Sequence, residues 1–156
     1  MKKTNLVAEP GKQEIVITRT FDAPRDLLFR VYIDPESMPK WLGPERLAMT
    51  IHKMEVRPGG EWRYTHSEPD GTAYGFRGVY HDVVAPERIV STFEFEGMPG
   101  HVSLDTAMFE EAGGKTTLTI KSVFQSVEDR DGLVQSGLES GMSESMDRLA
   151  RLVEKG

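Results

Sequence analysis

The chain has 156 residues, of which 38% are hydrophobic, and it contains no cysteine. This length predicts one domain that folds without a disulfide or a metal, and the lack of cysteine excludes thiol catalysis and cysteine-based metal sites. The net charge of −6 and the absence of a basic stripe argue against nucleic acid as a partner.

The first eleven residues contain no apolar run of the kind found in a signal peptide. Two lysines are followed by a mixed stretch that ends in the turn pair Pro10-Gly11. We therefore predict a flexible leader over residues 1–11 and a single domain over residues 12–156. No segment approaches the roughly 20 apolar residues of a membrane-spanning helix, so we expect a cytoplasmic protein without a membrane span.

The segment from Gln13 to Phe21 alternates between apolar and polar residues, which predicts a strand. Pro24 suits the first turn of a helix, because a missing N–H costs nothing there. Helical spacing continues to Asp34-Pro35 and resumes from Glu36 to Leu42, before Gly43-Pro44. We therefore predict two short helices after the first strand.

The next eighty residues alternate in the same way and are divided by turns rich in glycine and proline. The six predicted strands are Leu47–Arg57, Glu61–His66, Ala73–Val84, Arg88–Glu96, His101–Glu110 and Thr116–Phe124. One-sided alternation of this kind is typical of an antiparallel meander with one covered face and one wet face.

For two of these strands, Ala73–Val84 and His101–Glu110, the alternation bears on which side chains face the core. Between Ala73 and Val84, an aromatic set with Phe76 and Tyr80 opposes a set with Val79 and Val83, and either set could face the core. The apolar side chains of His101–Glu110 lie mostly on the face that carries Val102, Leu104, Thr106 and Met108.

From Ser126 onward the period becomes helical, and we predict one long amphipathic helix that closes the chain. Ser126 and Asp129 have the spacing of an N-terminal capping box. The predicted fold is α+β: a curved seven-stranded antiparallel sheet around the long C-terminal helix, with two short helices after the first strand.

Short motifs along nearly the whole chain carry a resemblance to a known family. They include Arg19-Thr20-Phe21-Asp22-Ala23-Pro24, Trp41-Leu42-Gly43-Pro44, Arg57-Pro58-Gly59-Gly60, Phe76-Arg77-Gly78-Val79-Tyr80, Pro86-Glu87-Arg88-Ile89-Val90 and Met146-Asp147-Arg148-Leu149. In this order they resemble the helix-grip fold of the START-like (SRPBCC) superfamily, in its branch of heat-shock-ATPase-activator homologues.

The resemblance implies the fold and leaves three functions open. The first expectation is non-enzymatic binding of an apolar or aromatic small molecule, such as a lipid or polyketide, between the sheet and the C-terminal helix. The second is an enzyme of the polyketide cyclase or dehydratase type that uses the same cavity. The third is a protein-interaction module related to chaperone ATPase activators. We expect a monomer or a weak homodimer.

An inward row of Trp62, Tyr64 and His66, beside Phe93 and Phe95, suits a pocket that is mostly apolar with a few polar groups. If the row lines a pocket, a void of roughly 300 Å³ or more should lie beside it. If the row only fills the core, its rings should contact one another. The full set of predicted ligand-binding residues is Trp41, Trp62, Tyr64, His66, Phe76, Phe93, Phe95, Met142 and Met146.

The family pattern usually has a Gly-Trp pair in the last helix, where this chain has Gly141-Met142. We expect the volume of the missing tryptophan to remain largely as cavity, because Leu138 and Ser145, one turn away on either side, are not aromatic.

The histidines lack the spacing of metal-ligand pairs, so we predict neither a metal site nor a cofactor. His66 is the strongest candidate for a general base, yet a lone inward histidine is more often a hydrogen-bonding group, and we assign no catalytic residue.

Overall fold

The computed structural model describes residues 3–154, and within them all strands belong to one antiparallel sheet of eight. The strands are β1 Asn5–Val7, β2 Glu14–Phe21, β3 Ala48–Met54, β4 Glu61–Ser67, β5 Ala73–Val84, β6 Arg88–Phe95, β7 Val102–Ala112 and β8 Lys115–Val123. The helices are α1 Arg25–Tyr32, the 3₁₀ turn η1 Met38–Lys40, α2 Val127–Gln135 and α3 Leu138–Val153.

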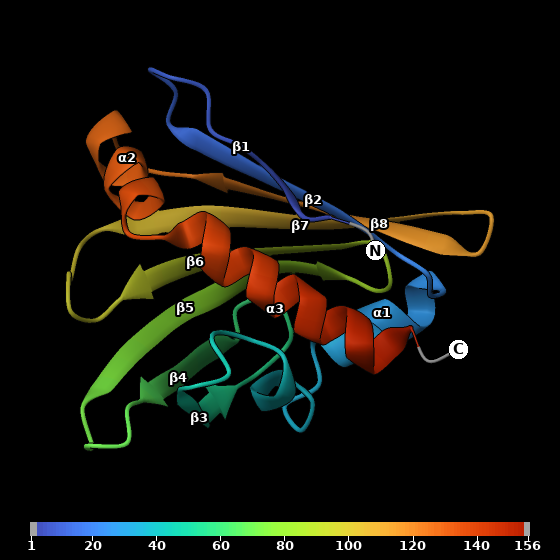
Figure 1. Ribbon diagram of the computed structural model, residues 1–156, viewed down its shortest axis with the longest axis horizontal. Helices are drawn as coiled ribbons and strands as arrows, with labels where there is room; N and C mark the ends of the chain where they lie inside the picture. Colours follow the sequence, from blue (N-terminus) through green and yellow to red (C-terminus); the bar gives the residue numbers. More distant parts are fainter. Residues whose placement is uncertain (1–2, 155–156) are drawn as a thin grey trace.

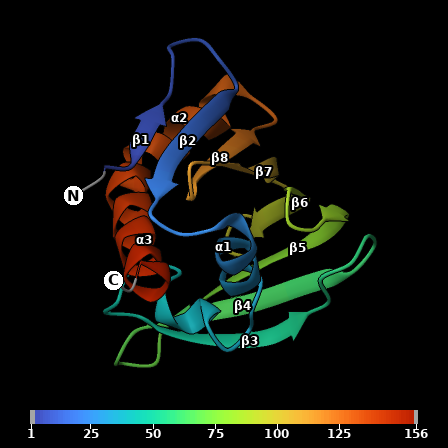
Figure 2. The same cartoon turned by 90° about the vertical axis from the view of Figure 1, so that its right-hand side faces the viewer.

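The sheet curves around α3, as the predicted helix-grip fold requires. Its spatial order is β1-β2-β8-β7-β6-β5-β4-β3, so the two edge strands come from the amino-terminal third of the chain. Figure 2 shows β1 and β2 at one end of the curve and β3 and β4 at the other, with α1 and α3 on the concave side. Figure 1 shows α3 crossing in front of the sheet.

The eighth strand comes from the segment that we expected to be a flexible leader. β1 pairs with β2, with Leu6 opposite Ile17, and the Leu6 side chain packs against the core. Nη1 of the buried Arg130 donates hydrogen bonds to the carbonyls of Glu9 and Glu14, at 2.8 and 3.2 Å. Residues 5–7 of the segment predicted as a leader therefore form a strand of the sheet, while residues 1 and 2 lie outside the described part of the chain.

The C-terminal helix is divided in two, which corrects the prediction of one long helix. Ser126 caps α2 as expected, because its Oγ accepts a hydrogen bond from the amide of Asp129 at 3.1 Å. Gly137, just before α3, has a φ of +96°. That left-handed conformation suits glycine and ends the first helical path. The second predicted short helix, Glu36–Leu42, is reduced to the single 3₁₀ turn η1.

A β-bulge resolves the facing of β5. Phe76 pairs with Phe95 and Tyr80 pairs with Ser91, but the register shifts between Tyr80 and Asp82. One extra residue in a strand reverses the facing of everything that follows. Tyr80 therefore faces the core before the bulge, and Val83 packs against the core after it.

The more apolar face of β7 points outward. Leu104 and Met108 are 45% and 42% exposed, whereas Ala107 and Phe109 are buried. Ser103 and Asp105 share the inner face with Ala107 and Phe109, which places two polar side chains beneath the helix layer.

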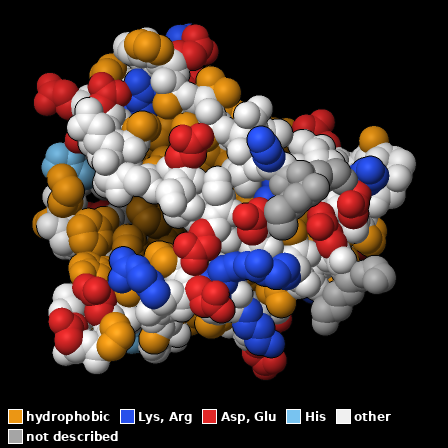
Figure 3. Space-filling view, viewed as in Figure 1, with side chains coloured by type: hydrophobic (Ala, Val, Ile, Leu, Met, Phe, Trp, Pro, Cys, Tyr) orange, Lys and Arg blue, Asp and Glu red, His pale blue; other side chains and the backbone are white. Residues whose placement is uncertain are grey.

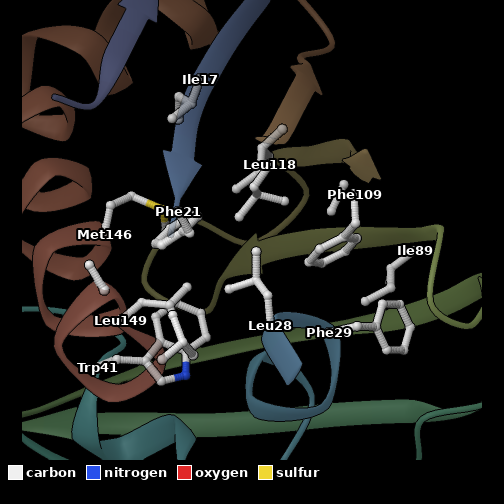
Figure 4. Packing of buried hydrophobic residues seen from close by; sticks show 14 of the residues in the cluster. Ile17, Phe21, Leu28, Phe29, Trp41, Ile89, Phe109, Leu118, Met146 and Leu149 are labelled. Atoms are coloured by element: carbon white, nitrogen blue, oxygen red, sulfur yellow. The ribbon is translucent and has the colours of Figure 1, made fainter. Parts of the chain in front are cut away.

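The dense part of the core lies between α1, the second half of α3 and the adjoining strands (Figure 4). The figure shows Met146 and Leu149 of α3 beside Phe21, with Leu28 nearby. Phe29 packs edge-on against Phe109 with ring centroids 5.1 Å apart. The buried residues of α3 all lie from its midpoint onward: Ser145, Met146, Leu149, Ala150 and Val153.

A salt bridge ties this half of α3 to the sheet. Arg19 of β2 is 2% exposed, and its Nη1 donates to Asp147 Oδ1 at 2.7 Å. The guanidinium also lies over the Phe21 ring at 5.4 Å. Asp147 is 37% exposed and remains partly solvated without its partner. Arg19 is buried, so loss of the salt bridge would leave its charge without compensation from water.

Replacing Asp147 should therefore destabilise the fold. Asp147→Ala leaves the buried Arg19 without its carboxylate, and because Asp147 is partly solvated we expect a loss of about 2–3 kcal/mol in the free energy of unfolding. Denaturant unfolding measures the loss. The matched control is Glu139→Ala on the exposed side of α3, which should change stability by less than about 0.5 kcal/mol. Equal effects of the two substitutions would contradict an anchoring role for Arg19–Asp147.

Candidate functional site

A cavity of about 240 Å³ lies between the inner face of the sheet and the first half of α3. Its walls come from β2 and β3–β8, from the segment around η1 and from Leu138 and Met142 of α3. Figure 3 shows a hollow lined by hydrophobic side chains beside the amino-terminal end of α3. The volume is somewhat below the roughly 300 Å³ expected from the sequence.

Five of the nine residues predicted from the sequence line this cavity, and four do not. The lining residues are Trp41, Trp62, Tyr64, Phe93 and Met142. Outside the lining are His66, Phe76, Phe95 and Met146. Met146 belongs instead to the dense core beneath the second half of α3.

The aromatic row both packs on itself and borders the cavity. Trp62 stacks on Tyr64 with centroids 5.4 Å apart, and Phe93 lies 5.9 Å from Trp62. Tyr64 also stacks on Phe76 at 5.3 Å, and Phe76 contacts Phe95 at 5.2 Å. The sequence allowed the row either to line a pocket or to fill the core, and the structure shows both. Trp62, Tyr64 and Phe93 form a cavity wall, whereas the rings toward His66 pack on one another.

His66 belongs to the packed end. It is buried, and a Cβ on Gly43 would lie only 2.5 Å from its Cε1, so the loop at Gly43 closes directly over the ring. Burial, with a smaller contribution from Arg148, lowers the pKa of His66 and favours the neutral imidazole. The position of His66 outside the cavity gives no support to its use as a general base there.

The same loop is joined to α3 by hydrogen bonds. The Gly43 amide donates to Ser145 Oγ at 2.8 Å, and Arg148 Nη1 donates to the Gly43 carbonyl at 2.7 Å. The Glu45 amide donates to Glu144 Oε2 at 2.7 Å. Loop and helix together form the wall of the cavity that carries Trp41.

Open space lies beside Gly141, and Met142 borders the cavity, where the family pattern usually has Gly-Trp. A Cβ built on Gly141 would meet nothing within 4 Å, and the Met142 side chain borders the cavity. The close packing that small residues at 137, 141 and 145 can indicate therefore occurs at Ser145 and not at Gly141.

A row of polar side chains crosses the cavity floor. In the register of the sheet, Tyr80 lies opposite Ser91, Ser91 opposite Asp105, and Asp105 opposite Ser122. All four line the cavity. Ser103 adds a further hydroxyl, with its Oγ 3.1 Å from Asp105 Oδ1. Four neighbouring strands therefore present one carboxyl group and several hydroxyls to an otherwise apolar space.

Asp105 lines the cavity but is not among the residues predicted from the sequence. Burial raises the pKa of its carboxyl from the ordinary value of 3.8 to about 6, and hydrogen bonds from Ser122 and Ser103 partly oppose the rise. No ion pair between residues 3 and 154 includes Asp105. A polar tip amid apolar walls is the arrangement by which ligand sites orient their ligands.

The tyrosines around the cavity are neutral hydroxyls. Burial raises the pKa of Tyr80 to about 12 and also raises the pKa values of Tyr32 and Tyr64, with the nearby Asp105 as a smaller cause for the last two. At physiological pH these groups offer hydrogen bonds and ring faces.

The described residues hold no cluster of three or more His, Asp or Glu side chains that could bind a metal ion. Over the same residues, no helix has the length and apolar character needed to cross a membrane.

A curved sheet that grips a helix above an internal cavity defines a START-like domain. The chain belongs to the family described as "Activator of Hsp90 ATPase homolog 1-like protein", whose model matches residues 22–154. No curated protein matches the chain.

Several solved structures share the whole fold. Protein Ms6760 from Mycobacterium smegmatis is 25% identical, with a TM-score of 0.86 over 96% of each chain. A protein from Staphylococcus epidermidis is 28% identical, with a TM-score of 0.80 over 94% of this chain and 92% of its own. A protein from Rhodobacter sphaeroides, at 22% identity and a TM-score of 0.87 over 96% and 97%, shows the likeness of fold alone.

The raised pKa of Asp105 predicts a stability cost that depends on pH. The unfolded chain releases this proton near pH 4 and the folded chain near pH 6, so the wild type loses stability relative to Asp105→Asn as the pH rises through that window. Above pH 7 we expect Asp105→Asn to be more stable by about 2–3 kcal/mol, and near pH 4 to match the wild type.

Denaturant unfolding of both proteins from pH 4 to pH 8 measures this difference. Glu110→Gln, on the exposed end of the same strand, is the control and should show no such trend. A constant difference between Asp105→Asn and wild type across the range would contradict the burial of an ionisable carboxyl at the cavity floor.

Proposed function

We propose that this protein binds an apolar or aromatic small molecule in the cavity between the sheet and the first half of α3, without changing it chemically. The observation that supports this most directly is a 240 Å³ cavity with aromatic and aliphatic walls and a polar floor. Burial of a ligand's apolar surface there would supply the main part of the binding free energy.

The division of α3 supports the same proposal. The second half of the helix is buried and tied to Arg19, whereas the first half carries Gly141 and Met142 above open space. A protein without a ligand gains nothing from leaving this volume unfilled, because an apolar cavity lowers stability in proportion to its volume.

An enzyme of the cyclase or dehydratase type is the second candidate, and Asp105 is the observation that favours it. A half-buried carboxyl with a pKa raised to about 6, in a cavity that Tyr64 and Tyr80 also line, could serve as a general acid or base. Catalysis would require the reacting atom of the substrate to lie within hydrogen-bond reach of Asp105.

Activation of a chaperone ATPase, which the family description mentions, is the third candidate. It draws no support from the cavity, because contact with a chaperone requires an extended exposed surface and not a hollow of small-molecule size.

Filling the cavity tests the leading proposal. Met142→Trp places a larger side chain in open space, so we expect stability to stay within about 1 kcal/mol of wild type, whereas overpacking a full core costs about 1–3 kcal/mol. Binding of the neutral probe naphthylethanol, followed by Trp fluorescence and calorimetry, should weaken at least about tenfold.

The matched control is Met98→Trp, the same substitution at an exposed position in the β6–β7 turn. It should leave the affinity for naphthylethanol unchanged. Absence of probe binding to the wild type, or equal binding by Met142→Trp, would overturn the proposal that the cavity is the ligand site.

Native mass spectrometry of protein purified from its own host separates carrier from enzyme. A carrier returns the compound it acquired unchanged, from wild type and Asp105→Asn alike. If the wild type carries a chemically altered product and Asp105→Asn carries its precursor, the enzyme reading replaces the carrier reading.

A further inference from the structure

The polar row on the cavity floor carries one carboxyl group, that of Asp105, and this group narrows the class of ligand. We propose that the ligand carries a protonated amine on its aromatic or apolar body, and that this amine binds Asp105. The inference rests on the proposed function, since it assumes that the cavity holds a ligand, and it adds the chemistry of the ligand's polar end.

The first argument is the unmatched charge of Asp105. Asp105 is half-buried on the cavity floor, and carboxylates that are withdrawn from bulk water are normally paired with a cation or held by several hydrogen bonds. Within residues 3–154, Asp105 has hydrogen bonds from two serine hydroxyls and no ion pair. A ligand ammonium group would supply the missing positive charge and would form a charge-assisted hydrogen bond.

The second argument is the surface around the carboxylate. All three of Tyr32, Tyr64 and Tyr80 line the cavity with Asp105. Besides burial, which is the main cause, nearby Asp105 and Tyr80 contribute to the raised pKa values of Tyr32 and Tyr64. Aromatic faces attract cations, with Tyr and Trp more effective than Phe. A cation at Asp105 would therefore meet rings as well as the carboxylate.

The third argument concerns Lys53, the only described basic residue in the cavity lining. Its Nζ lies 2.7 Å from Glu61 Oε1 and 3.8 Å from Glu55 Oε1, and its side chain is about half exposed. Its positive charge is therefore already balanced at the rim. The cavity offers an uncompensated negative charge and no uncompensated positive one, so an anionic ligand would be repelled.

Three probes that share one apolar body test the inference: naphthylethylamine, naphthylethanol and naphthylacetate, which are cationic, neutral and anionic at pH 7.5. Calorimetry should show that wild type binds the amine about tenfold or more tightly than the alcohol, as expected for one charge-assisted hydrogen bond, and binds the acetate most weakly. Asp105→Asn, a nearly isosteric neutral side chain, should bind amine and alcohol within about twofold of each other.

Two controls separate this inference from the proposed function. Glu110→Gln makes the same change in net charge on the outside of β7 and should keep the preference for the amine. Met142→Trp should weaken all three probes, which locates them in the cavity. Two results would overturn the proposal that a ligand amine binds Asp105: equal wild-type affinity for amine and alcohol, or a preference for the amine that survives Asp105→Asn. Either result would leave the cavity as a binding site. If no probe binds to the wild type, both proposals fail.

Discussion

The salt bridge from the buried Arg19 to Asp147 fastens α3 to the sheet, and the architecture of the interior depends on where this contact lies. It holds the second half of the helix, which the Gly43 loop also grips through Ser145 and Arg148. A helix held along its whole length would press its first half onto the strands. Since the hydrogen bonds and the salt bridge described for α3 all lie from Glu144 onward, the first turns of the helix can border a cavity without loss of the fold.

The carboxyl group on the polar floor lowers the stability of the folded protein when it is ionised. A serine or alanine in place of Asp105 would leave the sheet intact and remove a charge that burial disfavours. The raised pKa of Asp105 is the signature of that cost. Groups that lower stability in the folded protein are concentrated at functional sites, where a ligand or a reaction supplies the compensating interaction.

Most of the fold could be predicted from the sequence because alternation and turn residues are local signals. The exceptions have physical causes: β1 contributes one core-facing side chain, Leu6, too few for a pattern, and Gly137 divides a helix without changing its amphipathic stripe. The wall residues of the site were predictable from the Trp62–Tyr64 row. Asp105 was not, because its strand exposes the more apolar face, although serines at 91 and 122 interrupt two inward apolar rows on either side of it.

The bulge after Tyr80 has a consequence for comparing related chains. The residues of β5 before it and after it follow opposite parities. An alignment to an unbulged strand that places no gap at the extra residue therefore assigns Val83 to the solvent and Asp82 to the interior. At identities near 25%, gaps are placed by small differences in score. At position 81, an alignment can therefore match the strand length and still assign the following side chains to the wrong face of the sheet. The strand pairing shows where the gap belongs.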